Sequence, residues 1–128
     1  MPKQTLQVLP IQFVIHSLPS NALIPQEVFS APIYFIGKTQ EELSLVVPDT
    51  INIDSDDSDR DWRALEVLGP LNLSMVGIMA KIGSVLAAAK ISIFVVSTFE
   101  TDFFLVKQQD LNNATLALSK DGYKVIVD

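Results

Sequence analysis

The residues with the clearest capacity for chemistry lie in the segment 69–77, GPLNLSMVG, which precedes an amphipathic helical pattern. Asn72 or Ser74 could cap that helix, because either side chain can accept hydrogen bonds from N–H groups two or three residues later. The first N–H groups of a helix have no partner inside the helix and attract anions. The segment therefore predicts a helix start at which an anionic group of a small molecule could bind.

A second polar group lies at the end of the apolar strand predicted for residues 91–99, ISIFVVSTF. Ser97 and Thr98 end a run that is otherwise almost entirely apolar, so we expect their hydroxyl groups to need hydrogen-bond partners, of which a ligand is one. Asp102 lies in the turn that follows. Its carboxylate has two interpretations, a ligand contact or the side chain of an Asx turn.

Residue types that catalyse reactions are scarce in this chain, which has one histidine, His16, and no cysteine. His16 ends the first predicted strand, and the sequence assigns it no Ser or Asp partner. This favours a surface position over the role of a general base. The sequence also lacks a G-x-S-x-G elbow and a P-loop. We therefore expect a protein that is not an enzyme and that needs no cofactor.

Five aspartates crowd the segment 54–61, DSDDSDRD. A calcium loop of the EF-hand type requires Gly at its sixth position and a carboxylate at its twelfth. Counted from Asp54, these positions hold Asp59 and Leu65. The segment is therefore interpreted as an exposed connector rather than a metal site, because its carboxylates repel one another and it offers no apolar area to bury.

The composition excludes several other classes of protein. The 128 residues are 48% hydrophobic and carry a formal net charge of -6. Such a chain is apolar enough to fold as one compact domain or two small ones, and its acidic balance disfavours binding to nucleic acid or to an anionic membrane surface. No apolar run has the roughly 20 residues of a membrane helix, and the N-terminus lacks a signal-peptide layout. A cytoplasmic protein is expected.

Hydrophobic periodicity predicts the elements that position the candidate site. A strand at 63–68 leads into the loop, and a helix follows that ends near Lys90. A strand at 91–99 has two apolar faces and is expected to be central in its sheet; it returns through a tight turn into a strand at 103–107. The buried face of the helix is marked by residues at helical spacing: Ile78, Ile82, Val85 and Ala89, with Leu86 beside them.

The C-terminal end completes this section. Asp110 can cap a second helix, and Gly122 can take the positive φ that ends it before a last strand at 123–127. The inner face of this helix is predicted to hold Leu111, Ala114 and Leu118. The resulting order, β-α-β-β-α-β, is the ferredoxin-like pattern of an antiparallel sheet with both helices on one face.

An N-terminal section precedes this one and has a shorter version of the same order, so the chain is interpreted as α+β with two halves packed together. It contains a strand at 6–15, a short helical turn at 24–29, and a hairpin of strands 32–38 and 42–47. The predicted boundaries are 1–50 for the N-terminal half, 51–61 for the acidic connector and 62–128 for the C-terminal half.

Several short segments occur in a familiar order along the C-terminal half: WRAL at 62–65, GPL at 69–71, SMVGI at 74–78, ISIF at 91–94, STF at 97–99, TD at 101–102 and LVK at 105–107. With them, residues 62–127 resemble an ACT domain. The likeness is to the branch found in CASTOR-type arginine sensors and in small bacterial tandem-ACT proteins. The N-terminal half is similar to an ACT unit in outline only.

The resemblance implies a regulatory protein that binds a free amino acid, or a similar small metabolite, at an interface between ACT units. Backbone groups at the helix start would meet the ligand carboxylate, and Asp102, Glu100 or strand carbonyls at 97–99 would accept from its ammonium group. The ligand-binding residues implied are Ser74, Met75, Val76, Gly77, Ile78, Ser97, Thr98, Phe99 and Asp102.

Two of these residues keep a structural interpretation beside the functional one, since Ser74 could serve as the helix cap and Gly77 could be required for helix–sheet packing. The expected partners are a free amino acid, a second copy of the chain in a homodimer, and a regulated protein. The alternative function is a structural module that forms dimers without any ligand, because a ferredoxin-like fold need not contain a binding site.

Overall fold

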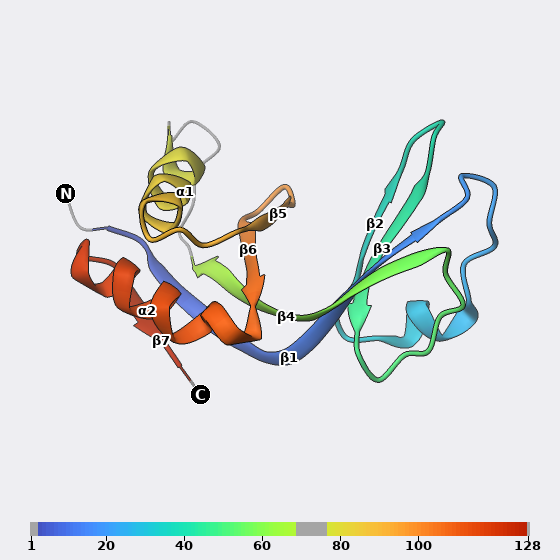
Figure 1. The fold of residues 1–128 in the computed structure, drawn as a ribbon, viewed down its shortest axis with the longest axis horizontal. Coiled ribbons are helices and arrows are strands. Elements are labelled where there is room, and N and C mark those ends of the chain that lie inside the picture. Colours follow the sequence, from blue (N-terminus) through green and yellow to red (C-terminus); the bar gives the residue numbers. More distant parts are fainter. Residues whose placement is uncertain (1–2, 69–76, 128) are drawn as a thin grey trace. The chain divides into compact units, whose positions relative to one another are not determined.

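A computed structural model describes residues 3–68 and 77–127 (Figure 1). The chain packs into two compact units. The helical unit consists of Met1–Pro10 and Arg63–Asp128, and the hairpin unit consists of Ile11–Trp62. Two long strands, β1 (Thr5–Leu18) and β4 (Asp57–Leu68), contribute residues to both units.

The helical unit has the predicted ferredoxin-like element order. After β4 come α1 (Ile78–Ala88), β5 (Phe94–Ser97), β6 (Asp102–Lys107), a short 3₁₀ turn (Gln108–Asp110), α2 (Leu111–Lys120) and β7 (Lys124–Ile126). β5 and β6 form an antiparallel hairpin in which Ser97 lies opposite Asp102. The α+β fold class inferred from the sequence is confirmed.

The first strand of the chain completes the sheet of the helical unit, which the sequence analysis did not anticipate. Within this unit the strands follow the order β7–β1–β4–β6–β5. Thr5 and Gln7 of β1 lie opposite Lys124 and Ile126 of β7 in a parallel pair. The βαββαβ series begins with β4 and ends with β7, and β1 therefore lies between these two strands in the sheet.

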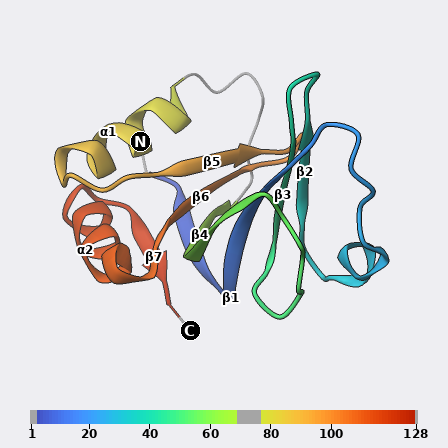
Figure 2. The same cartoon turned by 45° about the vertical axis from the view of Figure 1, so that its right-hand side comes forward.

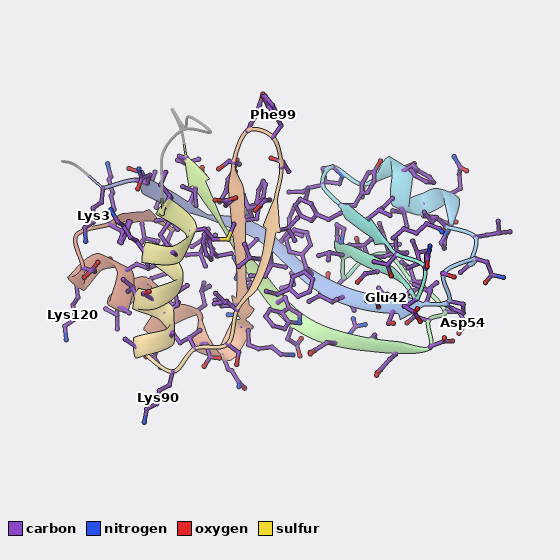
Figure 3. The ribbon with its side chains drawn as sticks, turned by 90° about the horizontal axis from the view of Figure 1, so that it is seen from above. Lys3, Glu42, Asp54, Lys90, Phe99 and Lys120 are labelled. Carbon is purple, nitrogen blue, oxygen red and sulfur yellow. The ribbon has the colours of Figure 1, made fainter. Side chains whose placement is uncertain are left out.

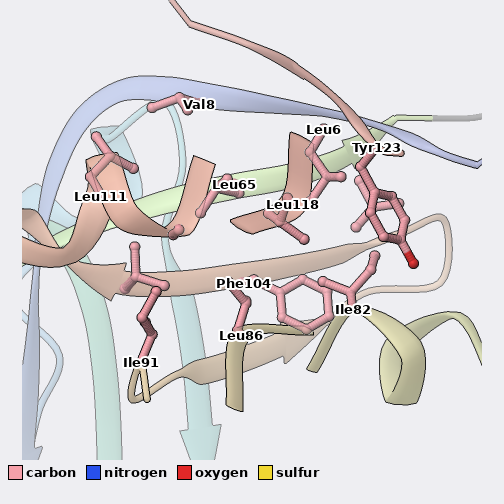
Figure 4. Close-up of a cluster of buried hydrophobic side chains, with 13 residues drawn as sticks. Leu6, Val8, Leu65, Ile82, Leu86, Ile91, Phe104, Leu111, Leu118 and Tyr123 are labelled. Atoms are coloured by element: carbon pink, nitrogen blue, oxygen red, sulfur yellow. The ribbon is translucent and has the colours of Figure 1, made fainter. Parts of the chain in front are cut away.

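One hydrophobic core joins both helices to the same face of this sheet, as predicted (Figure 4). The strands contribute alternate residues, such as Leu6 and Val8 of β1, because successive side chains of a strand point to opposite faces. The cluster of buried side chains comprises Leu6, Val8, Leu65, Val67, Ile82, Leu86, Ile91, Phe104, Val106, Leu111, Ala114, Leu118 and Tyr123. The predicted inner face of α2 is confirmed.

Three expectations about α1 and β5 are wrong. Ala89 is exposed and is the C-cap of α1, because the helix ends at Ala88, two residues before the predicted end near Lys90. The N-cap is Gly77, with φ of 78°, rather than Asn72 or Ser74. β5 lies at the edge of the sheet rather than at its centre, and its apolar side chains are only partly buried.

The hairpin unit is built on β2 (Phe35–Lys38) and β3 (Leu43–Pro48), which pair antiparallel as predicted. β3 also pairs with β1, where Leu18 lies opposite Leu43 and Phe13 opposite Pro48. In place of a full helix this unit has one 3₁₀ turn, Gln26–Ser30, whose only buried residue is Val28. Its core consists of Leu18, Val28, Leu43, Leu45 and Val47.

The acidic segment is partly a strand, where a connector was expected. β4 begins at Asp57, so residues 57–61 are extended, although their side chains are exposed as anticipated. Asp61 has a positive φ of 66° and precedes the buried Trp62.

The assignment of 1–50 and 62–128 as two ACT-like halves stays a prediction. Within the described ranges, no helix has the length and apolarity needed to span a membrane.

Candidate functional site

The tip of the β5–β6 hairpin holds four of the residues assigned to the site. The turn is closed by the Thr98 N–H, which donates to the Thr101 carbonyl at 2.8 Å, and by the Thr101 N–H, which donates to Thr98 Oγ1 at 3.2 Å. Phe99 projects from this turn with 82% of its surface exposed (Figure 3). A hydrogen-bonded turn therefore brings together four of the predicted site residues: Ser97, Thr98, Phe99 and Asp102.

The hydroxyl groups of this turn are not buried, which corrects one premise of the sequence analysis. Ser97 and Thr98 are both exposed, because the strand that carries them lies at the edge of the sheet. Thr98 Oγ1 is already engaged with the backbone of Thr101. These hydroxyl groups therefore do not require a ligand as a hydrogen-bond partner. They form part of an exposed polar turn.

Thr101 is a residue that the sequence analysis missed. Its hydroxyl group donates to the carbonyl of Val67, near the end of β4. The bond ties the hairpin tip to the strand that precedes the predicted ligand loop. A threonine in a turn is too common to reveal such a contact, so the tertiary structure was needed to find it.

Gly77 lies at the start of α1 in a left-handed conformation, with φ of 78°. Its carbonyl accepts from the Lys81 N–H at 2.8 Å, which is the first hydrogen bond of the helix. A Cβ built on Gly77 would meet no atom of residues 3–68 and 77–127 within 4 Å, so these residues leave the space beside the helix start open. The N–H groups that follow Gly77 are the unpaired donors of a helix N-terminus.

The site residues divide into those that the structure places and those that it does not describe. Ile78 is half-buried, its side chain packs against the core of the helical unit, and its backbone N–H belongs to the first turn of α1. Ser74, Met75 and Val76 lie outside the described residues. The first turn of α1 and the hairpin tip lie at the same end of the helical unit (Figures 2 and 3).

The single histidine belongs to the hairpin unit and is buried, so its predicted surface position is wrong. His16 is 3% exposed, and its Nδ1 lies 2.8 Å from Ser55 Oγ. Nε2 has no hydrogen-bond partner among the described residues. Burial, and to a lesser extent the positive charge of Arg60, lower the pKa of His16. The ring is therefore a neutral core group at pH 7.

No group of three or more potential metal ligands occurs in the part of the chain that the structure describes. The aspartates of 57–61 alternate along an extended strand. Residues two apart in a strand point to the same face, so Asp57 and Asp59 share a face, where both side chains are exposed.

The fold has clear structural relatives. A structural-genomics protein from Agobacterium tumefaciens is 29% identical, with 100% of this chain and 96% of that chain covered and a TM-score of 0.90. The regulatory subunit of aspartate kinase from Thermus thermophilus is 13% identical, with 88% and 95% covered and a TM-score of 0.61. The allosteric aspartate kinase of Clostridium acetobutylicum matches with a TM-score of 0.68 at 14% identity; 90% of this chain but only 34% of that enzyme is covered.

Comparison with curated proteins gives no match. A sequence model of the ACT domain matches residues 57–120, which is half of the chain. The matched range runs from the start of β4 to the end of α2 and so includes the hairpin tip and the first turn of α1. The chain therefore belongs to the ACT domain family.

Proposed function

We propose that this protein is a non-catalytic, cytoplasmic regulatory protein that binds a free amino acid at an interface between ACT units. The observation that carries the proposal is the match of an ACT domain model to residues 57–120. The similarity to a regulatory subunit of aspartate kinase, over 95% of that subunit, supports a regulatory role. Regulation requires that the amino acid bind one conformational or oligomeric state more tightly than another.

Two ends of the ligand require opposite chemistry, and the helical unit offers both. N–H groups of the first turn of α1 would donate to the ligand carboxylate, where the helix dipole also favours negative charge. The half-exposed Asp102 would accept from the ligand ammonium group, together with carbonyl groups at Ser97–Phe99. The open space beside Gly77 would admit the ligand backbone. Ser74, Met75 and Val76 would complete the site.

Thermal unfolding against the twenty amino acids tests binding. A ligand at ~100 times its dissociation constant adds roughly 2.7 kcal/mol to the free energy of unfolding, which raises the midpoint by several degrees for a chain of this size. We expect one amino acid, or a chemically related group, to give this shift. Titration calorimetry then supplies its dissociation constant. If no amino acid shifts the midpoint, the proposal fails.

Two variants place the site. Gly77→Asn adds a side chain to open space while keeping a residue type that tolerates positive φ, so the fold should be preserved. Asp102→Asn removes the proposed ammonium acceptor. Each should weaken binding about tenfold or more, the equivalent of roughly 1.4 kcal/mol. The matched controls, Gly122→Asn at the other positive-φ glycine and Asp110→Asn at the start of α2, should leave affinity unchanged.

A second function, ligand-independent assembly, is favoured by the exposed edge of the sheet. In the described residues β5 pairs only with β6, and Phe99 is exposed beside this edge. Unpaired strand edges readily accept another strand. Light scattering distinguishes the two functions: a regulatory protein should change its oligomeric state or partner affinity with ligand, whereas an assembly module should form the same dimer with and without it.

A further inference from the structure

A groove between the two helices of the helical unit lies outside the residues assigned to the amino-acid site. Its volume is about 730 Å³, within the range of roughly 300–1,000 Å³ that is typical of small-molecule sites. Its floor consists of small side chains from both helices, and cationic and hydroxyl groups surround them. The lining residues are Lys3, Ala80, Lys81, Ser84, Val85, Ala88, Ala89, Ala117, Lys120, Asp121 and Tyr123.

The charge of this groove is opposite to that of the whole chain. The formal net charge of the protein is -6, yet neither α1 nor α2 contains an acidic residue. Lys3 donates to the carboxylate of Asp121 at 2.6 Å and also to the Asp121 backbone carbonyl, so these two charges largely cancel. Lys81 and Lys120 make no ion pair within the described ranges. The groove therefore presents two uncompensated ammonium groups.

An aromatic side chain also contributes a hydroxyl group to this groove. Tyr123 is only 5% exposed and its ring lies 4.9 Å from Lys3 Nζ, but it also lines the groove. Its hydroxyl group has no hydrogen-bond partner among the described residues, and it lies at the margin of the hydrophobic cluster (Figure 4). This oxygen is not one of the buried unpaired polar atoms of the described residues, so it is accessible and can donate to a ligand in the groove. Ser84 Oγ lines the same groove.

We propose that this groove binds a small organic dianion, a phosphoryl compound or a dicarboxylate. Ammonium groups act as point charges that bind phosphate or carboxylate oxygens, and the Tyr123 and Ser84 hydroxyl groups would donate further hydrogen bonds. The alanine floor would contact the carbon skeleton of the ligand. A dianion matches the two uncompensated charges of Lys81 and Lys120. This site does not depend on the proposed amino-acid site, because the two share no residue.

The test is titration calorimetry of the full chain with pyrophosphate and with succinate at about 0.1 M salt. Pyrophosphate represents the phosphoryl source and succinate the dicarboxylate source, so their relative affinities distinguish the two. Binding should weaken about tenfold or more in the double variant Lys81→Ala/Lys120→Ala. The matched control, Lys90→Ala/Lys124→Ala, makes the same change in net charge with exposed lysines outside the groove, and should alter affinity less than about twofold.

A conservative variant separates ligand binding from folding. Tyr123→Phe keeps the ring beneath Lys3 and the packing of the core, so the unfolding midpoint should stay within a degree or two while affinity falls severalfold. Absence of binding by both probes at millimolar concentration overturns the proposal. Equal loss in the two double variants also overturns it, because that result indicates attraction by net charge alone. Retention of full affinity in Tyr123→Phe excludes the hydroxyl group from the site.

Discussion

The helical unit and the hairpin unit each place an antiparallel hairpin beside the long strands β1 and β4, but they close their cores differently. The helical unit covers one face of its strands with α1 and α2, and its core cluster has thirteen buried residues. The hairpin unit has a single 3₁₀ turn and a cluster of five. Since hydrophobic stabilisation scales with buried apolar area, the helical unit holds most of the stability.

The units also differ in where their polar groups lie. In the hairpin unit a histidine is buried against Ser55, whereas in the helical unit the polar groups lie at the hairpin tip and in the groove between the helices. Polar groups at a surface are free to exchange water for a ligand. Both proposed binding sites lie in the helical unit, and the hairpin unit is expected to have a structural role. The following measurements compare the two units.

Truncation of the larger core should have the largest effect. Phe104→Ala empties a fully buried position of the helical unit and should lower the free energy of unfolding by about 3–5 kcal/mol. Leu45→Ala, also fully buried but in the smaller core, should cost about 2–4 kcal/mol. Urea denaturation followed by circular dichroism measures both. A larger loss for Leu45→Ala would reverse the ranking of the two units.

The glycines of the two units should respond differently to alanine. Gly122 ends α2 with φ of 98°, so Gly122→Ala should cost roughly 1–2 kcal/mol through backbone strain. Gly37, in β2, has no such φ, and an added Cβ would lie 4.0 Å from the Cβ of Ser44. Gly37→Ala should therefore change stability by less than about 0.5 kcal/mol. Thermal unfolding compares the two variants, and equal losses would show that φ is not the cause.

Loss of the bond between the hairpin tip and β4 should have a smaller effect. Thr101→Val removes the donor to the Val67 carbonyl and should cost about 0.5–1.5 kcal/mol. Hydrogen exchange should also become faster at the Thr98 and Thr101 amides, which hold the turn. Thr115→Val is the control, because its hydroxyl group bonds only within α2, to the Asn112 carbonyl. If hydrogen exchange at these two amides is the same in Thr101→Val as in the wild type, the Thr101 hydroxyl group does not stabilise the turn.

The buried histidine should give the smallest effect, confined to a narrow pH range. Its pKa is lowered in the folded state by burial and by Arg60, so the unfolded chain binds a proton first. Stability from this group is complete above about pH 6.5 and is lost as the pH falls through the lower folded pKa. Urea midpoints between pH 8 and 5.5 should decrease for the wild type and less for His16→Gln. Identical slopes would assign the decrease to other groups.

Local signals in the sequence explain which parts of the fold could be predicted. The inner face of α2 follows from Leu111, Ala114 and Leu118 at helical spacing, and its end follows from Gly122. The two hairpins follow from short apolar runs separated by polar turns. The candidate site was predictable only as a set of segments. The sequence predicted a turn after the strand 91–99 and a helix after the loop, but the observed turn spans 98–101 and the observed N-cap is Gly77.

Other features have no local signal. His16 has the sequence position of a strand-end residue, but it is buried and its ring is hydrogen-bonded to Ser55, 39 positions later. Thr101 is an ordinary turn residue until its hydroxyl group meets Val67. Tyr123 begins a segment that the sequence predicts to be a strand. Nothing in the sequence indicates the groove that this residue lines.

The sequence alone thus determined the element types, the βαββαβ order and the ACT family, because periodicity, turns and short motifs are local properties of the chain. Only the tertiary structure decided the order of strands. β1 lies between β7 and β4, and β5 lies at the edge, although its apolar sequence suits a central strand equally well. Strand order depends on pairing between distant segments, and an alternating apolar pattern specifies which face is buried but not which neighbour lies beside it.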